Sequence, residues 1–195
     1  MMIDGLKIVV LASVLATPLF AQDAKICGDR KIRGEIATPI MAKTVGCGIV
    51  SPVRVTLVDD VRLSTPALID CTTAKALKTW VKKSAKPAFK RKGKLAELHV
   101  VASYSCRTRN NKPGAKMSEH SLGHAIDIAG FTLKNGKKVS VLNDWGKGKY
   151  RKPLNKVHAN ACGIFGTVLG PNSDVHHRDH FHFDTARYRN GPYCR

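Results

Sequence analysis

The sequence predicts an α+β fold, in which one compact domain has a small, mostly antiparallel sheet flanked by helices. Its 195 residues are enough for one domain with a real core. Its apolar patterns follow the order helix, strands, helix, strand, which favours this fold class. The dipeptide Asn135-Gly136 is a hairpin-turn signal between two strand-like segments, which makes those strands antiparallel.

The predicted first helix begins at Thr72 or Thr73, either of which can cap it, and runs to about Lys86. Pro87 marks its expected end, and a basic linker follows it. The lysines of this segment fall outside an apolar stripe at three-to-four spacing, formed by Ala74, Leu77, Trp80 or Val81, and Ala85.

The remaining elements follow in order. Residues 95–104, which are rich in Val and Leu, predict a strand, and residues 125–133 and 180–184 predict two more. Residues 138–141 are expected to return antiparallel after the Asn135-Gly136 turn. A helical pattern covers residues 154–168 and is expected to end at Gly170-Pro171.

The N-terminal part predicts an exported protein. Lys7 and the apolar run Ile8 to Leu15 resemble a secretory signal, and we assign residues 1–21 to it. The run is shorter than the ~20 apolar residues that span a bilayer, and no later segment is long and apolar enough to do so. An uncleaved anchor is the alternative. Residues 22–45 are expected to form an extension of the domain over residues 46–195, and residues 22 to about 65 to be irregular, with one or two short strands.

Cysteine content fits export. The six cysteines are widely spaced, without a C-x-x-C pair, which favours up to three disulfides over a thiolate zinc site. Fifteen pairings are open at this point.

A formal net charge of +19 predicts attraction to anionic polymers. For an exported protein, we expect peptidoglycan or another anionic envelope polymer as the partner. Nucleic acid is not expected, because only Trp80 and Phe89 flank the basic run of residues 82–94, too few for base stacking.

Two short segments carry most of the histidines. If residues 125–129 form a strand, Asp127 faces one side between small alanines, while the isoleucines on either side of it face the core. Gly123 allows a tight turn that would swing His120 back over Asp127. In the second segment, His182 and His180 point the same way on a strand. His120, Asp127 and His182 then form a three-ligand zinc site with an open position, which is the form of catalytic zinc sites.

These residues carry a resemblance. The pattern Ser118-x-His120-x-x-Gly123-x-Ala125-x-Asp127, followed by His180-x-His182, resembles the motifs of the D-Ala-D-Ala metallopeptidases and the penicillin-insensitive murein endopeptidases. From about Gly46 to the C-terminus, the chain more closely resembles the bacterial extensin-like C-terminal family. The segments that carry this closer resemblance are Tyr104 to Arg107, Ile126 to Phe131, Asp144-Trp145, Thr167 to Pro171 and Asp179 to Asp184.

The resemblance implies a zinc-peptidase-like fold and an exported zinc-dependent hydrolase that cleaves peptide bonds in peptidoglycan. It implies that Arg107 contacts the substrate and the developing oxyanion, and that His180 acts as general base or stabilises the transition state. Asp179 stands where some of these peptidases have a glutamate base, but on a regular strand it would face away from His180. His124 replaces an expected asparagine and is a candidate for lining the cleft or for a stray ligand.

A second hypothesis follows from the charge. A wall-binding module that retains the peptidase fold would bind anionic envelope polymers without catalysis.

Overall fold

The sheet is the main feature of this computed structural model, which describes residues 24–187 and 190–195. Its strands are β1 (Ala24–Ile26), β2 (Asp29–Ile36), β3 (Val53–Val58), β4 (Val61–Ile69), β5 (Leu95–Ala102), β6 (Ala125–Leu133), β7 (Lys138–Ser140), β8 (Thr167–Leu169), β9 (Phe181–Asp184) and β10 (Tyr193–Cys194). The strand order is β1-β2-β3-β4-β5-β6-β9-β8-β10, and β7 pairs with β6. Among these pairs, β4–β5 and β8–β10 are parallel and the others antiparallel, so the sheet is mixed and larger than predicted.

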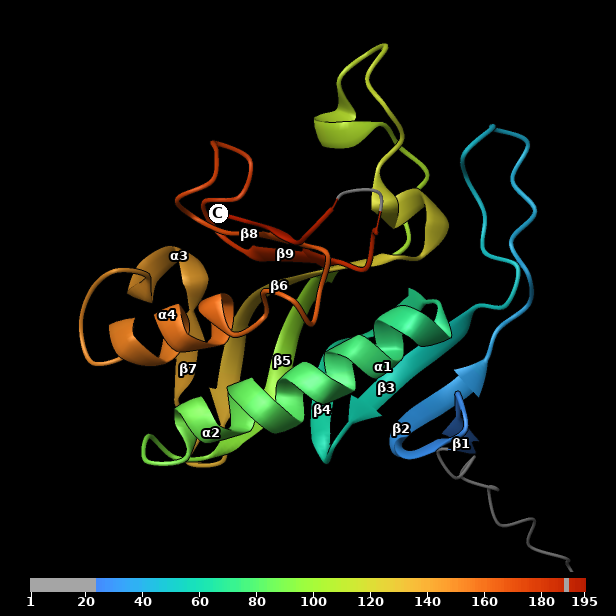
Figure 1. Cartoon of the computed structure of the whole chain (residues 1–195). Coiled ribbons are helices and arrows are strands. Elements are labelled where there is room, and N and C mark those ends of the chain that lie inside the picture. Colours follow the sequence, from blue (N-terminus) through green and yellow to red (C-terminus); the bar gives the residue numbers. More distant parts are fainter. Residues whose placement is uncertain (1–23, 188–189) are drawn as a thin grey trace, which may run out of the picture.

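The prediction that residues 22 to about 65 are irregular, with one or two short strands, is wrong. Strands β1 to β4 lie in this region and together build one end of the sheet (Figure 1). The turn between β3 and β4 consists of Asp59 and Asp60, both with positive φ (46° and 64°). Two-residue hairpin turns of this handedness usually contain Gly or Asn, and this one has neither, so the sequence lacked its usual signal. The predicted signal peptide lies outside the described residues.

The first helix runs further than predicted. It comprises α1 (Cys71–Trp80), a π-helical turn (Val81–Ala85) and α2 (Lys86–Phe89). Asp70 caps α1, because its carboxylate accepts a hydrogen bond from the Thr73 amide at 2.7 Å. Pro87 does not end the helix; it lies in the first turn of α2, directly after the π-helical turn.

The prediction of a helix over residues 154–168 is correct only for its first part. Helix α4 covers Arg151–Ala159, and the segment beyond it turns and becomes β8. Gly163, with a φ of +86°, lies in that turn. A short apolar strand cannot be distinguished from a buried helix by its periodicity, which explains the error. The short helix α3 (Val141–Asp144) precedes α4.

The core lies between the sheet and the helices that cross one face of it (Figure 1). From β6, Ile126 and Ile128 are fully buried, and from β9, Phe181 and Phe183 are as well. The ring of Trp80 in α1 lies 5.0 Å from that of Phe183, which places these side chains on the helical side. The residues between them in each strand therefore face the opposite side, as the alternation predicted.

Three disulfides cross-link the fold: Cys27–Cys71, Cys47–Cys106 and Cys162–Cys194. The prediction of up to three disulfides is confirmed. Such bonds are typical of proteins that reach an oxidising compartment. Over the described part of the chain, no helix is long and apolar enough to cross a membrane.

Candidate metal centre

The pairing of β6 with β9 places two of the predicted ligands side by side. Asp127 lies directly opposite His182 in the antiparallel register, so both side chains leave the same face of the sheet. Oδ1 of Asp127 lies 2.9 Å from Nδ1 of His182. Both side chains are buried, on the face away from the helices.

His120 reaches this pair from a 3-10 turn over Glu119–Leu122. Ser118 caps the turn, and Gly123 ends it in the left-handed conformation, with a φ of +71°. The turn brings Nε2 of His120 to 3.1 Å from Oδ2 of Asp127 and to 3.2 Å from Nδ1 of His182. The structure therefore brings together the three residues predicted as ligands.

The hydrogen bonds on the far side of each imidazole show that this donor set fits a cation. Nδ1 of His120 lies 2.5 Å from the Ser103 carbonyl oxygen, and Nε2 of His182 lies 3.1 Å from Oδ2 of Asp184. Each acceptor fixes the ring proton on the outer nitrogen, as is usual for metal-binding histidines. The inner nitrogens then present lone pairs to each other and to Asp127, so three acceptors converge.

The spacing of these acceptors would allow a metal ion to bind between them. Ligands about 2.1 Å from a tetrahedral ion are separated by about 3.4 Å. The three separations here are 2.9, 3.1 and 3.2 Å, which a small outward shift would bring to that value. Two imidazoles and one carboxylate are also a common ligand set of catalytic zinc.

In the metal-free protein, a proton on His182 supplies the positive charge of this cluster. Burial lowers the pKa of His182, but hydrogen bonds to Asp127 and Asp184 outweigh it and raise this pKa to about 9. Burial of Asp127 would raise the pKa of its carboxyl group, but hydrogen bonds from His120 and His182 hold that pKa well below its ordinary value. The cluster therefore favours a positive charge at its centre.

His180 and Asp179 form a second unit beside the cluster. Nε2 of His180 lies 3.7 Å from Oδ2 of Asp127, and Nδ1 of His180 lies 2.7 Å from Oδ1 of Asp179. The expectation that Asp179 faces away from His180 is wrong, because β9 begins only at Phe181 and the residues before it form turns. Asp179 is largely exposed and orients the His180 ring.

An open cavity of about 390 Å³ exposes the cluster, and Arg107 lines it together with His120, Asp127, His180 and His182. The cavity thus brings Arg107, which lies in the loop after β5, to the same space as the predicted ligands. His124, by contrast, faces a neighbouring depression, where its Nδ1 contacts Oε2 of Glu119 at 3.1 Å.

Two supporting groups were missed by sequence reasoning. Asp184 follows His180 and His182 at the same two-residue spacing, and that alternation was the available signal. The Ser103 carbonyl had no sequence signal, because any residue supplies a carbonyl. His177 also lines the cavity, with its Nδ1 2.8 Å from Oδ1 of Asp174 and its ring 5.2 Å from that of His180.

A protein-family model matches this chain over most of its length. The family model described as "Extensin-like protein C-terminus" matches residues 26–195, which include β2 and every residue of the cluster. No curated protein and no solved structure matches the chain. Since the family model covers most of the sequence, the chain belongs to the extensin-like protein C-terminus family.

Proposed function

We propose that this protein is an exported, zinc-dependent hydrolase that cleaves peptide bonds in peptidoglycan stem peptides or cross-links. The observation that carries the proposal is the convergence of His120, Asp127 and His182, each imidazole with its outer nitrogen bonded. The resemblance of the two motifs to zinc peptidases of the bacterial wall supports the substrate class.

Zinc bound by these three residues would polarise a scissile carbonyl and lower the pKa of water towards ~7. His180 is the favoured general base. Asp179 holds the proton on Nδ1 of His180, which leaves Nε2 as the acceptor facing the cluster. His180 would take the proton of the attacking water and return it to the leaving amine. Asp179 therefore serves to orient the base, and it ranks behind His180 as a base itself.

Arg107 would stabilise the negative charge that develops on the carbonyl oxygen. It is half-buried and lines the same cavity as the cluster. Loss of one oxyanion donor typically costs about 3–4 kcal/mol in the barrier. Its fixed positive charge also suits a substrate that carries carboxylates.

The disulfides agree with export, and the net charge agrees with an anionic wall polymer as the partner. The three disulfides fit an extracellular protein, and we place it in the periplasm or outside the cell. A net charge of +19 attracts the carboxylate-bearing peptides of the wall.

The test is incubation of the mature, zinc-loaded protein with purified peptidoglycan, followed by mass spectrometry of the soluble products. We expect products that disappear with a chelator and return with added zinc. His180→Ala should retain zinc and lose activity by about 10²–10⁴-fold. Absence of products from folded, zinc-loaded protein would refute the proposal.

A non-catalytic wall-binding module is the second candidate, and the high positive charge favours it. It predicts binding to wall polymer that is unchanged in His180→Ala, without any product. Products that require His180 would exclude this alternative.

A further inference from the structure

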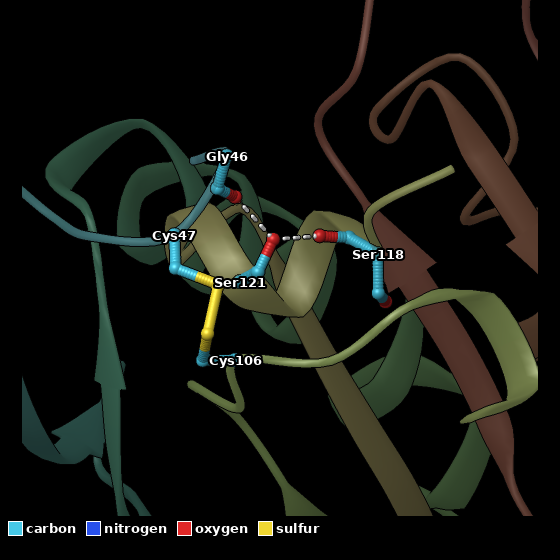
Figure 2. Close-up of a disulfide and its surroundings, with 5 residues drawn as sticks. All are labelled: Gly46, Cys47, Cys106, Ser118 and Ser121. Carbon is cyan, nitrogen blue, oxygen red and sulfur yellow. Dashed lines mark hydrogen bonds between the residues drawn. A yellow bond between two sulfur atoms is a disulfide. The ribbon is translucent and has the colours of Figure 1, made fainter. Parts of the chain in front are cut away.

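The Cys47–Cys106 disulfide lies beside the turn that carries His120 (Figure 2). Cys106 directly precedes Arg107, and Cys47 lies between Gly46 and Gly48. The bond thus joins two segments 59 residues apart in the chain, next to the cavity that contains the cluster. Its position suggests a role beyond general stability.

Ser121 connects the Cys47 segment to the turn. Its hydroxyl oxygen lies 2.7 Å from the Gly46 carbonyl oxygen and 2.5 Å from that of Ser118, and the side chain is fully buried (Figure 2). One hydroxyl proton is therefore shared by two carbonyls. The backbone adds a further bond, because the Gly48 amide donates to the Ser121 carbonyl at 2.8 Å.

The Cys106 segment holds the same turn from its other side. The Ser105 amide donates to the His120 carbonyl at 3.1 Å, and the Ser118 amide donates to the Arg107 carbonyl at 3.0 Å. These bonds fix the backbone of His120 relative to that of Arg107. Both segments that the disulfide joins therefore contact the turn that positions the first ligand.

Apolar packing attaches the Cys47 segment only at its far end, where Ile49 is buried and lies against Gly123. The side chains of Met41 and Val45 are 83% and 93% exposed. The backbone bridge between Ile40 and Ile49 closes the segment but does not attach it to the turn. Around Cys47 itself, the disulfide, the Ser121 hydroxyl and the Gly48 amide therefore attach the segment to the turn.

We propose that the Cys47–Cys106 disulfide and Ser121 together form a clamp that positions His120, so that the metal centre reaches full affinity only in the oxidised protein. This inference rests on the metal site of the proposed function. When the disulfide is reduced, the segment that holds Ser121 loses its covalent restraint, and the backbone of His120 is less restricted. Loss of such support weakens metal binding without removing a ligand.

The chain offers a matched control for each half of the clamp. Ser84 is also fully buried, and its hydroxyl has no hydrogen-bond partner, so Ser84→Ala removes the same atom without removing a clamp contact. Cys27–Cys71 closes a loop of comparable length, 44 residues against 59, and neither cysteine bonds to residues 118–121.

The serine test compares zinc affinities by competition with a chromophoric chelator. We expect Ser121→Ala to raise the dissociation constant for zinc by about 10- to 100-fold and Ser84→Ala to change it less than about twofold. Amide exchange at residues 118–123 in metal-free protein should be faster in Ser121→Ala alone. Equal affinities and equal exchange in the two variants would overturn the clamp.

The disulfide test uses Cys47→Ser/Cys106→Ser against Cys27→Ser/Cys71→Ser. Both should lower the thermal midpoint, but only the first should weaken zinc binding, again by about tenfold or more. Equal zinc affinity in both folded variants would refute the proposal. Peptidoglycan cleavage is measured separately, so an unaltered protein that binds zinc without cleaving anything contradicts the proposed hydrolase and leaves the clamp standing.

Discussion

Asp184 supports His182 on the side of the imidazole that faces away from Asp127. Its Oδ2 accepts the Nε2 proton of His182, and its Oδ1 accepts a hydrogen bond from the Ala186 amide at 3.1 Å. The carboxylate therefore fixes both the tautomer and the orientation of His182. At the scale of single residues, the candidate site therefore includes such partners as well as the three proposed ligands.

We expect Asp184→Asn to raise the dissociation constant for zinc by about tenfold or more, because the amide accepts the His182 proton less strongly. Asp174→Asn is the matched control, since Asp174 bonds to His177, which is outside the three-ligand set. The measurement is zinc competition with a chelator. Similar affinities in both variants would show that Asp184 does not support the site.

His182 gives the metal-free protein a pH-dependent stability. Burial opposes its charge, but Asp127 and Asp184 raise the pKa of His182 from 6.5 to about 9 in the folded protein. A raised pKa stabilises the folded state fully below about pH 6.5, and this contribution disappears as the pH rises through about 9. We expect a loss of roughly 3 kcal/mol in the free energy of unfolding over that window. Urea unfolding in excess chelator measures it.

We expect His182→Gln to remove this pH dependence of stability. Such a result would assign the pH dependence to the His182 imidazole. A free energy of unfolding that rises with pH between about 6.5 and 9 in metal-free, unaltered protein would contradict the assignment.

At the scale of elements, the site is made by one strand pairing and one turn. The register of β6 against β9 sets Asp127 opposite His182, and the 3-10 turn before β6 brings in His120. Gly123 ends that turn close to other residues. A Cβ placed on it would lie 2.4 Å from Cδ1 of Ile49 and 3.3 Å from the Asp70 amide nitrogen.

Gly123→Ala and Gly114→Ala separate the steric cost from the backbone cost. Both glycines have a φ of +71°, but a Cβ on Gly114 would meet nothing within 4 Å. We expect each substitution to cost about 1 kcal/mol for the left-handed backbone, and Gly123→Ala to cost a further ~1–3 kcal/mol because Ile49 is buried. Chemical denaturation measures both, and equal losses would contradict the close packing.

Some of the elements that form the site could be predicted from the sequence, and others could not. The two-residue alternation in β6 and β9 was sufficient to place Asp127 and His182 opposite the core, because only one register buries the isoleucines and phenylalanines. Asp59 and Asp60 lacked the glycine of a usual hairpin signal, so β3 and β4 were not recognised as a hairpin. The contact between Asp179 and His180 arises from an irregular turn, and no periodicity describes such a turn.

At the scale of the whole molecule, the large positive net charge is the property from which polymer binding is predicted. A net charge of +19 should make binding to anionic wall polymer fall steeply as salt rises. We expect this binding to be unaffected by a chelator, because it does not depend on the metal cluster. Co-sedimentation with insoluble peptidoglycan between low and high salt measures it, and binding insensitive to salt would show that charge is not its source.

The most direct test of the account is the zinc content of the purified, folded protein after gel filtration. From the proposed function, we expect about one zinc per chain in the unaltered protein and almost none in Asp127→Ala, because that variant removes the central carboxylate of the cluster. Unaltered protein that retains no zinc, or an Asp127→Ala variant that retains as much as the unaltered protein, would contradict the proposed metal centre.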